Sequence, residues 1–123
     1  MKNTEINYLY RDACNYKNHN REIVRGVITK EQIETIMNCL EERKYFIPSQ
    51  VGLPETRFET ITSEDHCWFE LGEDDFRITE SEEITIVMSV NELVECFLAA
   101  KGKWDESLFI GYDKEKINKN RRD

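Results

Sequence analysis

Two stretches of the sequence decide the fold: residues 28–40, ITKEQIETIMNCL, and residues 88–100, MSVNELVECFLAA. In each, an apolar residue is followed by a threonine or serine, and a glutamine or glutamate comes three positions after that hydroxyl. This spacing is typical of a capping box, in which the hydroxyl and the longer side chain each bond the backbone at the start of a helix. The sequence therefore predicts two helices that begin directly after Thr29 and Ser89.

Apolar residues recur in both predicted helices at the spacing that places them on one face. The buried faces are expected to contain, in the first helix, Ile33, Ile36, Met37 and Leu40, and in the second Leu93, Val94, Phe97 and Leu98. Gly102 is a suitable left-handed stop for the second helix. A run rich in β-branched residues precedes each helix, at residues 22–28 and 84–87, so each stretch is predicted to be a strand-to-helix unit.

Short extended segments are predicted for most of the remaining chain. Residues 6–10 alternate in polarity like a strand, and the polar residues 15–20 favour a turn. Further extended segments are expected at residues 45–48, 58–62, 67–71, 76–79 and 108–110. Together these elements predict an α+β fold: a small, mainly antiparallel sheet with two helices packed on one face. Residues 1–113 are expected to form a single domain, and residues 114–123 a charged, flexible tail.

The composition favours a small cytoplasmic protein. Of 123 residues, 39% are hydrophobic, which is enough for one modest core, and no apolar run approaches the length of a membrane-spanning helix or a secretory segment. The four cysteines lie far apart without a C-x-x-C pattern, so we expect free thiols. No cofactor is predicted, and we expect no membrane partner.

Charge is unevenly distributed along this acidic chain, whose formal net charge is −8. Residues 1–30 contain six lysines and arginines against three acids, whereas residues 55–83 contain two against eleven. A net charge of this sign disfavours general binding to DNA or RNA, because phosphate contacts need clustered cations. The basic first quarter could still hold one small anionic ligand.

The block YRDACNYK at residues 10–17 combines aromatic rings, an amide and cations, a mixture suited to stacking a base and pairing with phosphate. The candidate ligand-binding residues are Tyr10, Arg11, Asn15, Tyr16, Lys17 and Arg57. The structural alternative is that the tyrosines pack in the core, Asp12 and Asn15 form the turn, and the cations are solvated or pair with acids.

A second candidate surface is acidic and would occupy a cationic groove on another protein, as a nucleic-acid mimic does. Its candidate residues are Glu64, Asp65, Glu73, Asp74 and Asp75. The plain alternative is a solvated face that keeps a small protein soluble. No metal site is predicted at His66 and Cys67, because neighbouring strand residues point to opposite faces. None of the common catalytic or phosphate-binding motifs is present, so an enzyme is not expected.

Three blocks carry a resemblance: YLYRDACNYK at residues 8–17, FIPSQVGLP at residues 46–54 and DHCWFEL at residues 65–71. They resemble the signature blocks Y-R-D-x-x-N-Y-K, F-I-P-x-Q-V-G-L-P and D-H-x-W-F-E-L of a family of small uncharacterised proteins from bacteria, phages and mobile elements. This resemblance implies a role in countering host defence, either by sequestering a nucleotide signal or by blocking a nuclease.

These observations lead to two functional hypotheses. The first is a non-enzymatic binding protein that sequesters a small anionic, nucleotide-like ligand. The second is an acidic inhibitor of a nucleic-acid-handling host enzyme, in the manner of an anti-CRISPR protein. A small sheet with uncovered edges is often completed by a second copy, so a homodimer is also expected.

Overall fold

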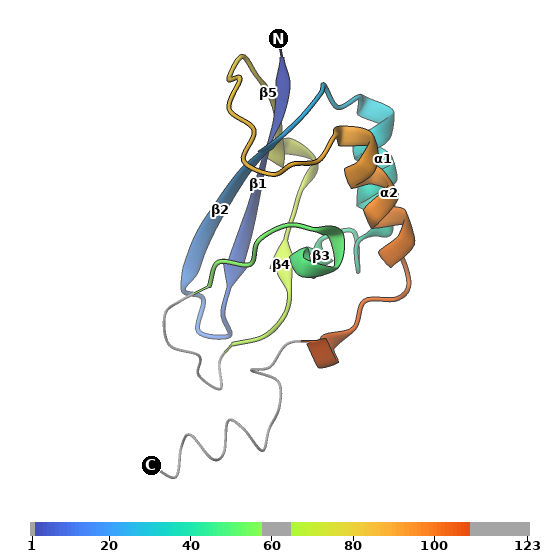
Figure 1. The fold of residues 1–123 in the computed structure, drawn as a ribbon. Coiled ribbons are helices and arrows are strands. Elements are labelled where there is room, and N and C mark those ends of the chain that lie inside the picture. Colours follow the sequence, from blue (N-terminus) through green and yellow to red (C-terminus); the bar gives the residue numbers. More distant parts are fainter. Residues whose placement is uncertain (1, 58–64, 109–123) are drawn as a thin grey trace.

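The computed structural model describes residues 2–57 and 65–108. It has an antiparallel sheet and two α-helices, so the predicted α+β fold is confirmed (Figure 1). The strand order is β2-β1-β4-β3, and β5 also pairs with β1. The strands are β1 (Asn3–Arg11), β2 (Lys17–Val24), β3 (Tyr45–Phe46), β4 (Phe69–Glu70) and β5 (Phe76–Thr79). Because β2, β4 and β5 all pair with it, β1 is the central strand.

The hairpin between β1 and β2 turns earlier than predicted. Arg11 pairs with Lys17, and the Asp12 carboxylate accepts hydrogen bonds from the backbone N–H groups of Cys14 and Tyr16, both at 2.9 Å. Asn15 adopts a left-handed conformation at φ 69°, which asparagine tolerates better than most residues. Of the turn predicted for residues 15–20, only residues 15 and 16 lie in the turn, because residues 17–20 are paired in β2. The alternative in which Asp12 and Asn15 form the turn is the one observed.

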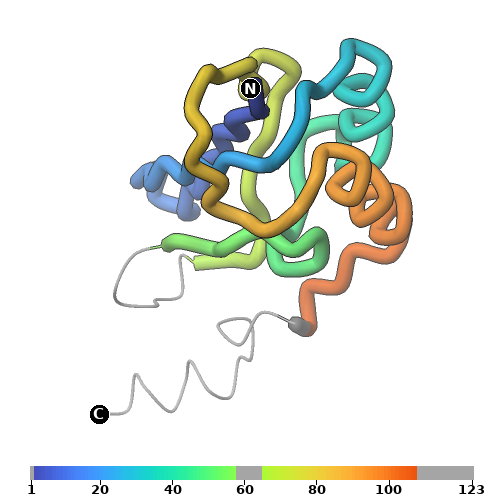
Figure 2. The backbone as a smooth tube through the Cα atoms, turned by 45° about the horizontal axis from the view of Figure 1, so that its top comes forward, coloured from blue at the N-terminus to red at the C-terminus, as the bar shows by residue number. Residues whose placement is uncertain are grey.

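The two helices cover one face of the sheet. Alternation along β1 buries Ile6, Tyr8 and Tyr10 on the side of α1 (Lys30–Cys39) and α2 (Val90–Ala100), with which they share the main core. Figures 1 and 2 both show α1 and α2 side by side; Figure 2 turns the molecule so that its top comes forward. The predicted placement of both helices on one face is therefore correct.

Both predicted capping boxes are present. The hydroxyl groups of Thr29 and Ser89 accept from the backbone three residues on, and the side chains there bond back to the caps. The amide of Gln32 then donates to Asn91 at 2.8 Å, which joins the first turns of the two helices. Gly102 has the left-handed conformation expected of a helix stop, at φ 71°.

The strand predicted at residues 84–87 does not form. The N–H groups of Thr85 and Ile86 both bond the single carbonyl of Ile23, and only Ser89 makes a parallel bridge, to Arg25. A β-branched run becomes a strand only where a partner runs along its length, and here it crosses the edge of β2 at one point. The strand predicted at residues 22–28 likewise ends at Val24, shortly before Gly26 at φ 97°.

One predicted core residue is exposed. Leu98 is 51% exposed, while Val90 and Ala100 are buried in its place. The buried stripe of α2 is therefore rotated from the predicted one, because the helix packs on its neighbour at an angle that the sequence does not specify.

The remaining elements are short helical turns: η1 (Pro48–Val51), η2 (Glu73–Asp75) and η3 (Glu106–Leu108). The predicted strand at residues 58–62 and the predicted tail at residues 114–123 lie outside the described residues, as does most of the edge strand predicted at 108–110. Within residues 2–57 and 65–108, no helix is long and apolar enough to span a membrane.

Candidate functional site

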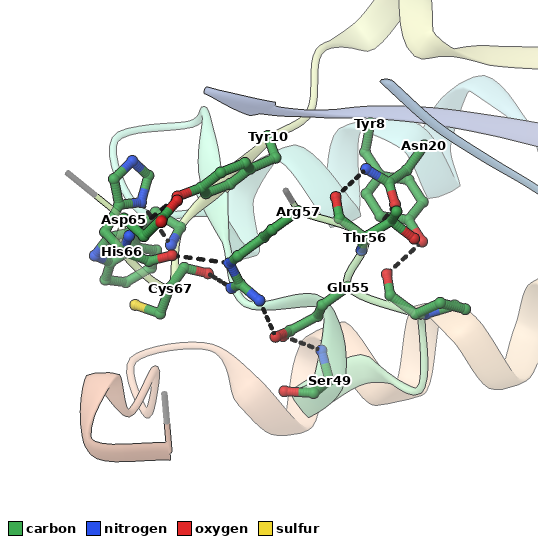
Figure 3. A network of polar contacts seen from close by, with 12 residues as sticks. Tyr8, Tyr10, Asn20, Ser49, Glu55, Thr56, Arg57, Asp65, His66 and Cys67 are labelled. Atoms are coloured by element: carbon green, nitrogen blue, oxygen red, sulfur yellow. Dashed lines mark hydrogen bonds and ion pairs between the residues drawn. The ribbon is translucent and has the colours of Figure 1, made fainter. Parts of the chain in front are cut away.

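Arg57, one of the predicted ligand-binding residues, is directed into the protein. Its side chain is 9% exposed and forms a 2.9 Å ion pair with Glu55. Its guanidinium also donates to the carbonyl oxygens of His66 at 3.0 Å and Cys67 at 3.1 Å (Figure 3). The same group lies 4.8 Å from the centre of the Phe69 ring. Arg57 therefore links the segment that follows η1 to the segment that leads into β4.

Tyr10 and Asp65 belong to the same internal network. The Tyr10 side chain is fully buried, and its hydroxyl donates to the Asp65 carboxylate and accepts from the backbone N–H of His66 at 3.2 Å (Figure 3). Burial raises the pKa of Tyr10 above its ordinary value. Asp65 is itself buried, so its carboxylate is turned toward the core and away from any partner surface.

The other predicted ligand-binding residues lie on the hairpin, and their side chains point away from that network. Arg11 pairs with Glu70 at 3.0 Å and also donates to the side chain of Asn15. Tyr16 is 69% exposed, and Lys17 is exposed. None of the six predicted residues lines either of the two cavities described below, so the structure does not bring them together around one pocket.

Three of the acidic candidates lie together on η2, whereas Asp65 is buried. Glu73 pairs with Arg43 at 3.6 Å, Asp74 is exposed, and Asp75 accepts a bond from the backbone of Gly72 at 2.7 Å, which caps η2. Glu64 lies outside the described residues.

The larger cavity is a cleft of about 970 Å³, which we call the acidic cleft. Its lining includes three aromatic rings and four carboxylates, and the described residues that line it include no lysine or arginine. The lining residues are Glu41, Glu42, Tyr45, His66, Trp68, Gly102, Trp104, Asp105, Glu106 and Ser107. They come from the turn after α1, from the segment before β4 and from the segment after α2, three regions that are distant in sequence.

The two tryptophans are fixed by internal hydrogen bonds. The indole N–H of Trp68 donates to Glu106 at 2.8 Å, and that of Trp104 donates to the carbonyl of Cys39 at 3.0 Å. Trp104 also packs edge-on against Phe46 and Phe97. Because both N–H groups are already used, the rings can offer a ligand their π faces and apolar edges but no further donor.

His66 forms part of the cleft wall, and its two ring nitrogens have assigned roles. Nδ1 accepts from the backbone N–H of Trp68 at 3.0 Å, and Nε2 lies 2.7 Å from the carbonyl oxygen of Arg11. Since a carbonyl can only accept, the proton is on Nε2. The adjacent Cys67 is buried, which raises the pKa of its thiol to about 12. This pair is therefore arranged for packing, since a nucleophilic cysteine needs a lowered pKa and a nearby base.

The segment after α2 is tied down where it borders the cleft. Gln50 donates to the carbonyl of Lys103 at 3.2 Å and accepts from the N–H of Asp105 at 2.8 Å. The hydroxyl and backbone of Ser107 both bond the Asp105 carboxylate, and these bonds lower its pKa. Asp105 therefore keeps its negative charge to a lower pH than an aspartate without these bonds would.

Sequence reasoning identified neither the tryptophan pair nor the carboxylates of this cleft. The only available signal was that Trp104 is followed by two acids, Asp105 and Glu106. Nothing local shows that the two tryptophans line one cleft, because that depends on the path of the chain after α2.

Among residues 2–57 and 65–108, no group of three or more histidine, cysteine, aspartate or glutamate side chains is placed to hold a metal ion.

Comparisons with other proteins do not identify the chain. No family model matches the sequence, and neither the curated proteins nor the solved structures contain a match.

Proposed function

We propose that the chain is a non-catalytic binding protein that accepts a cationic segment of a partner protein in the acidic cleft. The observation that carries this proposal is the lining of the cleft: three aromatic rings and four carboxylates, with no lysine or arginine among the described lining residues. It retains the second hypothesis, an acidic inhibitor, but moves the contact surface away from the five acids first proposed for it, which are Glu64, Asp65, Glu73, Asp74 and Asp75.

The chemistry of the cleft suits arginine and lysine side chains. Guanidinium and ammonium groups are attracted to the faces of tryptophan and tyrosine rings, and this attraction increases as the cation is desolvated. Carboxylates beside those rings accept charge-assisted hydrogen bonds from the same cation. An anionic ligand would meet repulsion from Glu41, Glu42, Asp105 and Glu106 together.

The dimensions of the cleft favour a peptide segment over a single ion. A volume of about 970 Å³ is at the upper end of the range for small-molecule sites and has room for several side chains. Proteins that handle nucleic acid present clustered lysine and arginine in their grooves. That class of partner agrees with the expectation that the chain counters host defence, which stays a prediction.

The intrinsic fluorescence of the protein tests this proposal directly, because both tryptophans of the sequence, Trp68 and Trp104, line the cleft. A short peptide of alternating arginine and glycine should change the emission on titration. The same peptide with citrulline in place of arginine should not, since citrulline keeps the shape but lacks the charge. No change with the arginine peptide would overturn the proposal.

A matched pair of variants separates the cleft from general electrostatics. Glu41→Gln/Glu42→Gln removes two lining carboxylates, whereas Glu82→Gln/Glu83→Gln removes two exposed carboxylates that do not line the cleft. The first variant should weaken peptide binding about five- to tenfold, since each partly exposed ion pair contributes up to about 1 kcal/mol. Equal losses in both variants would show that the peptide responds only to net charge.

A further inference from the structure

The sheet face that the helices leave open is cationic, although the chain as a whole carries a net charge of −8. Register places Arg11 opposite Lys17, Asn7 opposite Arg21, and Glu5 opposite Arg77. The β1 member of each pair is at an odd-numbered position, and its side chain points away from the buried face of Ile6, Tyr8 and Tyr10. The open face is defined by residues Glu5, Asn7, Leu9, Arg11, Lys17, His19, Arg21, Lys44, Glu70 and Arg77.

Two glutamates on this face are covered by the cations that pair with them. The side chains of Glu5 and Glu70 are 14% and 15% exposed, whereas their partners Arg21, Arg11 and Lys44 are 56%, 36% and 52% exposed. Lys44 approaches Glu70 to 3.7 Å from the side opposite Arg11. Each carboxylate therefore lies beneath the surface, and the charge presented to solvent is positive. Five lysine and arginine side chains face two glutamates here, a local excess of three positive charges.

Exposed basic side chains follow one another along β2. Lys17, His19 and Arg21 are exposed at alternate positions of β2. Alternate residues of an antiparallel strand are about 6.8 Å apart, twice the rise of one residue, which is close to the distance between successive phosphates of an extended nucleic-acid strand. Tyr16, 69% exposed, lies at the end of this row and offers a ring on which a base can stack.

We infer that the open face binds the backbone of a single-stranded nucleic acid. A hollow of about 590 Å³ on this face is lined by Asn7, Leu9, His19, Lys44 and Glu70 among others, and the carboxylates of Glu42 and Asp75, which also line it, disfavour a small anion enclosed there. A polymer needs no enclosure, because each of its phosphates can meet a different cation along the strands. This inference does not depend on the acidic cleft.

Fluorescence anisotropy with a labelled oligothymidylate of about 15 nucleotides, a length that one single-strand-binding fold can cover, tests the inference. Lys17→Ala/Arg77→Ala removes cations at the two ends of the face, and Lys30→Ala/Lys101→Ala removes two exposed lysines near the helices. We expect the first variant to bind the oligonucleotide more weakly. The negative slope of the logarithm of the association constant against the logarithm of salt concentration should become shallower by about 1.4, since each phosphate contact on a single strand contributes about 0.7.

The control variant Lys30→Ala/Lys101→Ala has the same net charge as Lys17→Ala/Arg77→Ala. It should bind the oligonucleotide as tightly as the natural sequence does. Absence of binding at low salt would overturn the inference, and so would equal losses in the two variants. Equal affinity for a duplex of the same length would overturn the assignment to single strands. Circular dichroism of each variant checks that the fold is retained.

Discussion

Tyr10 and Asp65 lie 55 residues apart in the sequence, and the hydroxyl of Tyr10 donates a hydrogen bond to the Asp65 carboxylate inside the protein. The same oxygen accepts from the backbone N–H of His66. The central strand is thereby joined to the segment that leads into β4. Two residues that the sequence placed in opposing functional hypotheses, one in an anion site and one on an acidic surface, instead contact each other.

Replacing Tyr10 with phenylalanine should lower the free energy of unfolding by about 1–3 kcal/mol, because it removes a buried hydrogen-bond donor from Asp65 and an acceptor from His66. Urea denaturation measures the effect. Tyr16→Phe is the matched control, since that ring is exposed and the change should stay within about 0.5 kcal/mol. An unchanged midpoint for Tyr10→Phe would show that the hydroxyl contributes nothing to stability.

Replacing Arg57 with lysine should also destabilise the protein, by about 2 kcal/mol. The charge is kept, but a lysine ammonium cannot reproduce the planar fork with which Arg57 reaches the His66 and Cys67 carbonyls and Glu55 together. Arg25→Lys, at an exposed position, provides the control in the same denaturation experiment. If both substitutions have the same small effect, the geometry of the fork is unimportant and only the charge matters.

Alkaline pH should destabilise the fold through Tyr8 and Tyr10. Burial raises the pKa of both hydroxyls above 10, so above pH 10 the unfolded chain loses protons that the folded chain keeps. The free energy of unfolding must then fall as pH rises, by at most about 1.4 kcal/mol per pH unit for each tyrosine. Denaturation midpoints measured from pH 8 to pH 11 should show this fall. Tyr10→Phe should make it shallower and Tyr16→Phe should not; equal slopes in all three proteins would refute the assignment.

The helices could be predicted because their signals are local. Capping boxes and helix stops depend on residues within one or two turns of each other, and both helices begin where Thr29 and Ser89 indicate. The strand at residues 84–87 was predicted from β-branched residues alone and does not form, because a strand also needs a partner that no local pattern reveals.

The candidate sites were harder to predict than the fold. Arg57 lies in a strongly acidic part of the sequence, where a free surface cation is the obvious interpretation, yet its partners are mainly backbone carbonyls that no composition reports. The lining of the acidic cleft depends on where the segment after α2 passes the segment that leads into β4. By contrast, the alternation that creates the open face was present in residues 6–10, and its cations became visible only once the register with β2 was known.

His66 contacts both of the regions for which binding is proposed. The residue lines the acidic cleft, and its Nε2 donates to the carbonyl of Arg11, whose guanidinium is on the open face. His66 therefore connects the lining of the proposed peptide site to the backbone of a residue whose side chain lies on the proposed nucleic-acid surface. Any coupling free energy transmitted through that ring must be reciprocal: a basic peptide that changes oligonucleotide affinity by some factor must have its own affinity changed by the same factor.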